Sequence, residues 1–142
     1  MNKPGMRVVS GVLFYPDASF YSDGSRVLMG LRKPGGKRPG LWELPGGKLE
    51  PGEDPRQALS REWGEELGLS IVATDYIATS FLDLEVSFHI DLYVVRQLDD
   101  RQPQALYHVQ LEWVSPLEAV QHLPCSPAFY LHWPHLRRFM AG

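Results

Sequence analysis

The chain has 142 residues, of which 44% are hydrophobic and 22% charged, as in globular proteins and unlike disordered chains. Its formal net charge is -3 with a pI near 5.9, so it lacks the basic field that binding to duplex nucleic acid requires. A single cysteine, Cys125, excludes a disulfide framework and favours a cytoplasmic setting, and residues 1–16 hold no continuous apolar run that would predict secretion or a membrane span. We expect one domain over residues 1–142.

The first half of the chain predicts strands followed by loops. Two β-branched and aliphatic runs, 7–14 and 26–32, predict strands, and the Asp23-Gly24 turn signal between them predicts a hairpin or neighbouring strands. Residues 33–40 are basic and rich in Gly and Pro, which predicts an exposed loop that is either a solvated turn or faces phosphate. Residues 41–55 contain two Pro-Gly pairs and predict a shaped loop, in which short fragments can pair briefly as strands.

A helix is predicted from about residue 55 to residue 67. Asp54 is a favourable N-cap, Pro55 suits the first helical position, and Gly68 is typical of a left-handed helix stop. Three apolar residues recur at every fourth position and form the core-facing stripe: Leu59, Trp63 and Leu67.

The last turns of this helix carry three carboxylates, Glu62, Glu65 and Glu66, at positions i, i+3 and i+4. On a helix this spacing brings them within about 6 Å of one another, at the end where the macrodipole disfavours acids. A solvated acidic face explains this crowding poorly, although Arg61 and Glu65 could form an ordinary i, i+4 pair. A divalent cation with hard oxygen ligands, Mg²⁺, Mn²⁺ or Ca²⁺, explains it more simply. Beside a basic Gly-rich loop, such a site indicates a phosphate-bearing small molecule.

The second half of the chain predicts further strands and two helices. Residues 70–81 and 85–95 predict two antiparallel strands, the second with one alternating apolar face, and 109–114 predicts another strand. A capping box at 115–118 predicts a short helix, and 126–140 has helical spacing that Pro134 is expected to kink or interrupt. Consecutive strands without helices between them indicate a mixed or antiparallel sheet.

Residues 47–69, GKLEPGEDPRQALSREWGEELGL, resemble the Nudix box. Trp63 departs from that pattern, standing where an aliphatic residue is usual, and we expect it to alter core packing rather than chemistry. The lead-in LWELPGGKLEPGE and the flanking strands also resemble MutT-like members along nearly the whole chain. All the fixed positions of the box are met, by Gly47, Glu53, Arg61, Glu62, Glu65, Glu66 and Gly68, with apolar Leu69 closing the motif.

The resemblance implies an α/β (α+β) Nudix fold, a mixed β-sheet sandwiched between helices in an α/β/α arrangement. It implies a Mg²⁺ cofactor, with Mn²⁺ as the alternative, bound by Glu62, Glu65 and Glu66 and by the backbone carbonyl of Gly46. Glu62 is the candidate general base. The coupled acids, Glu65 among them, share the catalytic role in a way that geometry has to decide.

Four further residues gain roles from the same resemblance. Arg61 would orient the acids, and Glu53 would reach the same cluster across the loop. Lys48 and Arg32 would face the triphosphate, although Arg32 is equally consistent with a surface charge at a strand end.

The implied reaction is attack of water on phosphorus in a nucleoside diphosphate linked to another group; a nucleoside triphosphate yields monophosphate and pyrophosphate. The proline that follows the box in ADP-ribose-specific members is absent, and the tyrosine of diadenosine polyphosphate hydrolases is matched by Val86 and Ser87. This leaves the MutT-like group that acts on nucleoside triphosphates, including oxidised or non-standard ones, in sanitation of the nucleotide pool. Where MutT has an asparagine that binds oxidised guanine, the segment 123–128 offers only Ser126, which does not support a preference for 8-oxoguanine.

Alternatives remain at this point. The chain is either an enzyme on nucleoside triphosphates, a hydrolase of another nucleoside diphosphate derivative, or a non-catalytic nucleotide-binding module, and the complete set of box acids favours an enzyme. MutT supplies a further metal-site glutamate from a loop, but residues 105–110 lack an acid, so Glu85 or Glu112 would have to substitute. We expect no membrane partner, either a monomer or a homodimer, and no role for the histidines. Four aromatic residues are candidates to contact the base: Tyr76, Phe81, Tyr107 and Phe129.

Overall fold

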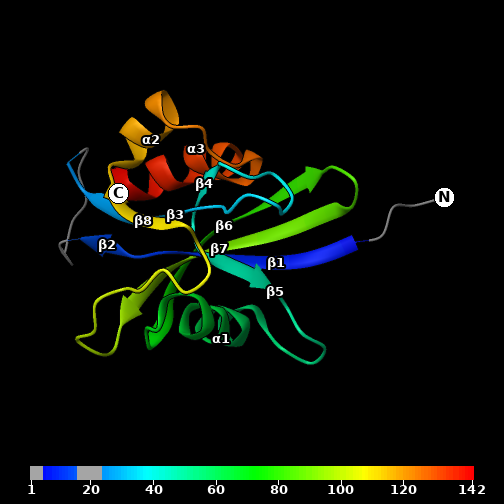
Figure 1. The fold of residues 1–142 in the computed structure, drawn as a ribbon, viewed down its shortest axis with the longest axis horizontal. Coiled ribbons are helices and arrows are strands. Elements are labelled where there is room, and N and C mark those ends of the chain that lie inside the picture. The colour runs from blue at the N-terminus through cyan, green and yellow to red at the C-terminus, as the bar shows by residue number, and fades with distance from the viewer. Residues whose placement is uncertain (1–4, 16–23) are drawn as a thin grey trace.

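The computed structural model describes residues 5–15 and 24–142, which form two β-sheets and three helices (Figure 1). Within this part of the chain the first sheet has the strand order β5–β1–β7–β6. Its strands are β1 (Gly5–Val12), β5 (Gly46–Lys48), β6 (Ile71–Asp83) and β7 (Ser87–Gln97). In the second sheet β3 pairs with each of the other strands: β2 (Phe14–Tyr15), β3 (Arg26–Leu31), β4 (Trp42–Glu43) and β8 (Gln110–Val114).

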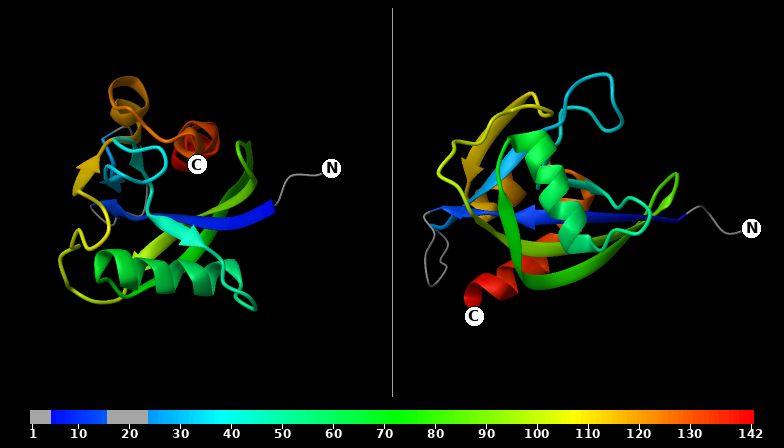
Figure 2. Two further views of the ribbon diagram at one scale, coloured as in Figure 1. Left: turned by 45° about the vertical axis from the view of Figure 1, so that its right-hand side comes forward. Right: turned by 90° about the horizontal axis from the view of Figure 1, so that it is seen from below.

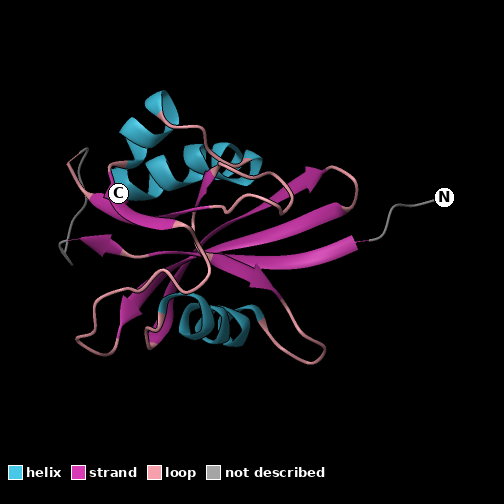
Figure 3. Ribbon diagram, viewed as in Figure 1, coloured by secondary structure: helices cyan, strands magenta, loops and turns pink. Residues whose placement is uncertain are grey.

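The helices cover the strands from opposite sides. The ribbon views show α1 (Pro55–Leu67) on one side and α2 (Pro116–His122) with α3 (Pro127–Ala141) on the other (Figures 2 and 3). The first sheet is mixed, because β1 runs parallel to β7 while the β1–β5 and β6–β7 pairs are antiparallel. The predicted sandwich with a mixed sheet is therefore confirmed. None of the helices in the described ranges combines the length and apolar character needed to cross a membrane.

Strand β7 is buried on both faces, whereas its sequence predicted a single apolar face. Leu92 and Val94 belong to the core under α2 and α3, and Tyr93 and Val95 belong to the core under α1. β7 lies between β1 and β6 with a helix over each face, so both sets of side chains leave water. The two side chains that break the apolar alternation, Tyr93 and Val95, are themselves hydrophobic enough to join the second core.

The predicted N-terminal hairpin exists only in part. β2 pairs with β3 in the register Phe14 with Val27, but β1 enters the other sheet as the neighbour of β7. Of the turn predicted between the strands, Asp23 lies outside the described residues and Gly24 is in a turn. The apolar run 7–14 is thus shared between two sheets, which a strand pattern alone does not reveal.

The helix α1 begins and ends where its capping residues predict. The Asp54 side chain accepts a hydrogen bond from the Gln57 amide, and the Gln57 side chain accepts one from the Asp54 amide, which completes a capping box. Gly68 closes the helix with a φ of 70°, in the left-handed region that glycine tolerates best. The predicted core stripe is fully buried: Leu59, Trp63 and Leu67.

Two expectations about local structure were wrong. The Pro-Gly-rich segment was predicted to be a loop at Gly46 and Gly47, but both belong to β5 and pair with β1. A Cβ atom on Gly46 would lie 1.9 Å from the Val9 carbonyl oxygen, so the missing side chain is what allows β1 to approach. The helix α3 continues through Pro134, so the interruption considered there does not occur, and the kink stays a prediction. Pro134 has no N–H to bond the carbonyl of Tyr130, four residues earlier in the helix. Both residues are exposed, so water can bond that carbonyl instead.

The indole of Trp63 connects α1 to the residue that precedes β5, because its Nε1 donates a 3.0 Å hydrogen bond to the Pro45 carbonyl. We predict that Trp63→Phe lowers the free energy of unfolding by about 1–3 kcal/mol, since it removes this hydrogen bond and places a smaller ring in a fully buried site. Urea unfolding measures the effect. As a control, Phe81→Leu changes a side chain on a residue that is 72% exposed and should stay within about 0.5 kcal/mol of wild type. Equal stability of Trp63→Phe and wild type would contradict the prediction.

Candidate active site

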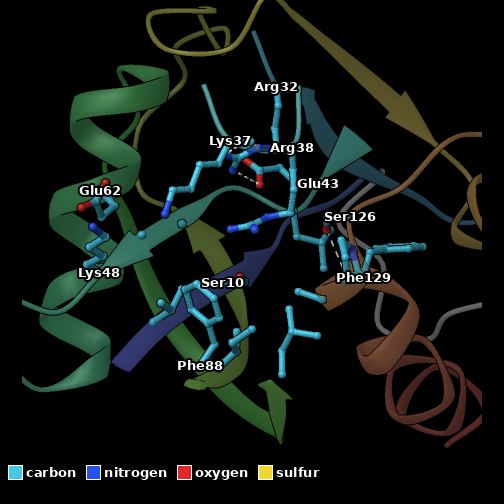
Figure 4. A pocket seen from close by; sticks show the side chains of 18 of the residues that line it. Ser10, Arg32, Lys37, Arg38, Glu43, Lys48, Glu62, Phe88, Ser126 and Phe129 are labelled. Atoms are coloured by element: carbon cyan, nitrogen blue, oxygen red, sulfur yellow. Dashed lines mark hydrogen bonds and ion pairs between the residues drawn. The ribbon is translucent and has the colours of Figure 1, made fainter. Parts of the chain in front are cut away.

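A pocket of about 680 Å³ opens between α1 and the start of α3. Figure 4 shows Glu62 and Lys48 at one end of it and Ser126 and Phe129 at the other. The loop 33–40 and the β6–β7 turn contribute further lining residues between these ends. The pocket thus joins the acidic helix predicted from the sequence to the segment at Ser126, some sixty residues later in the chain.

Arg61 connects the acids at the α1 end. Its Nε and Nη2 atoms donate to both carboxylate oxygens of Glu53 at 2.8 and 2.9 Å, and its Nη1 donates to Glu62 Oε1 at 2.9 Å. Nη2 also donates to the Lys48 carbonyl at 3.0 Å, which fixes the guanidinium against β5. The hydrogen bonds from Arg61 lower the pKa of Glu53 to about 2, and a further hydrogen bond from the Glu50 amide contributes. Glu53 is therefore ionised at every pH at which the protein would normally be studied.

Gly47 leaves room for the Glu62 carboxylate beside β5. A Cβ atom at Gly47 would lie 2.4 Å from Glu62 Cδ, closer than any side chain allows. Burial raises the pKa of Glu62, and the hydrogen bond from Arg61 opposes that rise. Gly47 therefore has a steric role in this chain: it lets a half-buried carboxylate lie against the backbone of β5.

Glu66 is the most deeply buried of the three helix acids. Glu66 is 6% exposed, and its Oε2 atom is buried with no hydrogen-bond partner among the described residues. Burial raises the pKa of Glu66 to about 9, with further increases from the charges of Glu62, Glu43 and Glu65 and a small opposing contribution from the Gly46 backbone. No cation among the described residues therefore bonds this oxygen, and a charge on it would be costly.

The three predicted metal ligands come close together but do not form a ready-made metal site. Within residues 5–15 and 24–142, no three His, Cys, Asp or Glu side chains are grouped to hold a metal. Arg61 instead holds Glu62 and approaches Glu65 Oε2 at 3.4 Å. The donor types nevertheless fit a hard divalent cation, since all are oxygens and Glu66 offers an unpaired one beside the Gly46 backbone.

Glu43 is an acid of the pocket that the sequence analysis did not identify. Its Oε1 accepts a 2.9 Å hydrogen bond from Arg32 Nη1, and its Oε2 lies 2.9 Å from His108 Nε2. The His108 side chain is fully buried, and a Cβ atom on Gly30 would lie 2.4 Å from its ring. Arg32 therefore lines the pocket as expected but is already paired with Glu43 and with the Lys37 carbonyl. The position of Glu43 within LWELPGG was the only signal available in the sequence.

The two acids considered as a further metal-site carboxylate have other partners. Glu85 accepts from Arg38 Nη1 at 3.1 Å and from Lys37 Nζ at 3.4 Å. A hydrogen bond from its own backbone, followed by the one from Arg38, lowers the pKa of Glu85 to about 2. Glu112 lies on β8, is exposed, and accepts from Gln110, outside the residues that line the pocket.

Of the aromatic candidates, Tyr107 and Phe129 line the pocket. Tyr76 and Phe81, 53% and 72% exposed, are not among its lining residues. The sequence analysis missed Phe88, which lines the pocket beneath the Arg38 guanidinium at 5.7 Å. It also assigned no role to the histidines, yet two buried ones contribute here: His108 contacts Glu43 and His132 lines the wall.

Known proteins resemble this chain in sequence and in fold. The model of the NUDIX domain family matches residues 14–138. The CTP pyrophosphohydrolase of Escherichia coli (strain K12) is 40% identical over 119 residues, which cover 82% of this chain and 83% of that protein. The nucleoside triphosphatase NudI of Salmonella newport is 36% identical over 90 residues, covering 63% of this chain and 58% of that protein.

Solved structures show the same fold. The E. coli ORF135 protein has a TM-score of 0.73 and 34% identity, over 98% of this chain and 91% of that one. The MutT protein from Methanosarcina mazei Go1 has a TM-score of 0.77 at 23% identity, over 98% of this chain and 95% of that one. At that identity the second likeness concerns the fold alone.

The buried carboxyl of Glu66 predicts a dependence of stability on pH in metal-free buffer. Below about pH 4.5 the group is neutral in both states, but above it the unfolded chain releases the proton that the folded protein keeps up to about pH 9. This contribution to stability is therefore complete at low pH and is lost as pH rises towards 9. We predict that Glu66→Gln reduces the loss of stability between about pH 6 and about pH 8, measured by urea unfolding with chelator.

The matched control for this experiment is Glu65→Gln, because the Glu65 side chain is 60% exposed and gains little from losing its charge. It should keep the wild-type change in stability between the two pH values. An unaltered pH dependence in Glu66→Gln would show that the Glu66 carboxyl is ionised in the folded protein.

Proposed function

The chain belongs to the NUDIX family of hydrolases, and from that premise we propose that it hydrolyses nucleoside triphosphates to monophosphates and pyrophosphate with Mg²⁺ or Mn²⁺. The observation that carries the proposal is the buried, unpaired Glu66 carboxyl, which lies among other acids at one end of the pocket. The names of the relatives, a CTP pyrophosphohydrolase and a nucleoside triphosphatase, support the class of substrate. We propose further that residues 1–142 form one domain and work in the cytoplasm.

Glu62, Glu65, Glu66 and the Gly46 carbonyl would hold the metal. A bound divalent cation supplies charge neutralisation at the phosphoryl group and lowers the pKa of a bound water molecule. The three side chains approach from one helix face, and the Gly46 backbone approaches from β5, so the donors come from two directions. Glu65 is mostly exposed and can turn from Arg61 towards Glu66, since its 3.4 Å contact is long and solvated.

Glu62 is the residue that we assign as general base. Arg61 holds its Oε1, so the remaining oxygen is free to face the water that attacks phosphorus. Burial, which raises the pKa of Glu62, improves it as a proton acceptor, and the Arg61 hydrogen bond opposes that rise. Glu53 acts through Arg61 as a positioning residue, because it accepts two of the guanidinium hydrogen bonds.

Basic side chains near the acids would bind the phosphates. Lys48 lies at the same end of the pocket as Glu62 (Figure 4), and its exposed ammonium is available for a phosphate oxygen. Arg32 stands across the pocket, where Glu43 and the Lys37 carbonyl orient it. The loop 33–40, left open by the sequence as a solvated turn or a phosphate-facing loop, carries Lys37 and Arg38 into the pocket lining and so supports the second interpretation.

We predict that the wild-type protein releases pyrophosphate from nucleoside triphosphates with Mg²⁺ and not with chelator. Glu62→Gln and Glu66→Gln should each lower turnover by about two orders of magnitude or more, because each removes a charge on which metal binding or proton transfer depends. Pyrophosphate release from a panel of canonical and oxidised triphosphates measures this, with thermal unfolding to confirm folding. Glu118→Gln, on the distant helix α2, is the matched control and should keep wild-type turnover. Wild-type turnover in either site variant would contradict the assignment.

Glu85 gives a separate prediction. Because Lys37 and Arg38 hold its carboxylate, Glu85→Gln should leave the Mg²⁺ concentration for half-maximal activity unchanged. It should instead change KM, since it frees two cations beside the substrate. Titration of activity with Mg²⁺ at fixed substrate distinguishes the two effects. A higher requirement for Mg²⁺ in the variant would return Glu85 to the metal site.

A further inference from the structure

The end of the pocket remote from the acids has a different chemical character. Its wall is mainly apolar and aromatic, and two polar side chains interrupt it, Ser126 and His132. The Ser126 hydroxyl is already occupied in part, because it caps α3 by accepting from the Phe129 amide at 3.3 Å. The apolar residues that line the pocket include Leu44, Leu82, Val86, Phe88, Ile90 and Phe129.

His132 is buried in this wall with half of its hydrogen-bonding capacity unused. It is 1% exposed, and its Nδ1 lies 3.0 Å from the Ser80 hydroxyl of β6. Its Nε2 is buried and has no partner among the residues that the structure describes. Because His132 follows Phe129 by three residues in α3, the two side chains lie on the same face of the helix, and both line the pocket.

The imidazole is neutral near pH 7. Burial lowers the pKa of His132 to about 4, and the charge of His135 lowers it further. A neutral imidazole has one N–H donor and one acceptor, and the bond at Nδ1 decides which of them Nε2 becomes. Since the Ser80 hydroxyl can donate or accept, Nε2 can serve as acceptor or donor for a ligand.

An unpaired polar atom in an apolar wall is costly, and so is the polar edge of a planar heterocycle that enters such a wall. Each would satisfy the other. The aromatic faces of Phe88 and Phe129 suit a flat ring, and a single polar contact in an apolar site discriminates strongly between edges that match it and edges that do not. Nε2 is shielded in the free protein, so contact requires a small side-chain rearrangement, as is common on binding.

We propose that His132, anchored by Ser80, determines which base is accepted when a nucleobase lies at this end of the pocket. The inference rests on the proposed function for the class of ligand, a nucleotide. It goes beyond that function by naming the residue that sets specificity, and it moves this role away from Ser126, the position suggested by the comparison with MutT. The base inserts its hydrogen-bonding edge towards Nε2 while its phosphates extend towards Lys48 and the acids.

Binding of nucleoside monophosphates tests this without metal or turnover. Calorimetry with CMP, UMP, AMP and GMP in chelator gives four dissociation constants for each variant. His132→Leu keeps an apolar side chain of similar size and should reduce the preference for the best base by about tenfold or more, as expected from losing one buried hydrogen bond. His132→Gln places an amide near the Nε2 position and should retain discrimination while changing the order of preference.

Two further variants make the result specific. Ser80→Ala removes the anchor of the ring and should alter the same ratios in the same direction as His132→Leu, by a smaller factor. His135→Leu, on the same helix but not among the pocket-lining residues, is the matched control and should keep the wild-type ratios. Thermal unfolding shows which variants fold, and if His132→Leu does not, Ser80→Ala and His132→Gln decide the question.

Wild-type ratios in His132→Leu, or in both His132→Gln and Ser80→Ala, would overturn the proposal and make His132 a core residue only. A wild-type protein that binds no monophosphate would overturn it as well. If the wild type binds monophosphates selectively but releases no pyrophosphate from triphosphates, the proposed function fails while the base site stands. If it is active, His132→Leu should raise KM for the preferred triphosphate and leave kcat near the wild-type value, since the ring lies far from the acids.

Discussion

The arrangement of the site depends on one guanidinium. Arg61 pairs with Glu53, Glu62 and Glu65, so a single positive charge holds acids that would otherwise repel one another. It cannot serve Glu66, whose carboxyl is buried beyond its reach and keeps an unpaired oxygen. The protein therefore compensates part of its acidic cluster internally and leaves the deepest member uncompensated. That residual imbalance is the physical reason to expect a cation at this place rather than a plain surface network.

The surrounding structure serves this arrangement through close backbone approaches. Gly46 lets β5 come against β1, and Gly47 lets Glu62 lie beside β5. Trp63 secures the same strand from the other side through its hydrogen bond to the Pro45 carbonyl. The larger ring at this position thus gains a polar contact that an aliphatic side chain lacks.

The mixed sheet and the limits of α1 were predictable, whereas the detailed packing that long-range contacts determine was not. The limits of α1 follow from Asp54 and Gly68, which act within a few residues of the helix ends. The burial of β7 on both faces depends on strands and helices far away in the chain, so its alternation pointed to one face only. In the same way, the box indicated Glu62 and Arg61, but Glu43 and His132 gain their importance only when β4 and α3 close the pocket.

Segment 105–110 lacks an acid, but the same long-range contacts place it beside one. In MutT a loop preceding a Glu-Trp pair supplies an additional glutamate, and the corresponding loop here supplies His108. The His108 ring contacts Glu43, and the negative charge of Glu43 is close enough to raise the pKa of Glu66. Additional negative charge thus reaches the acidic cluster from β4 instead of the loop, with His108 and Arg32 holding it from either side. Gly30 on β3 makes the space for the imidazole, so the contact between His108 and Glu43 depends on a glycine outside the Nudix box.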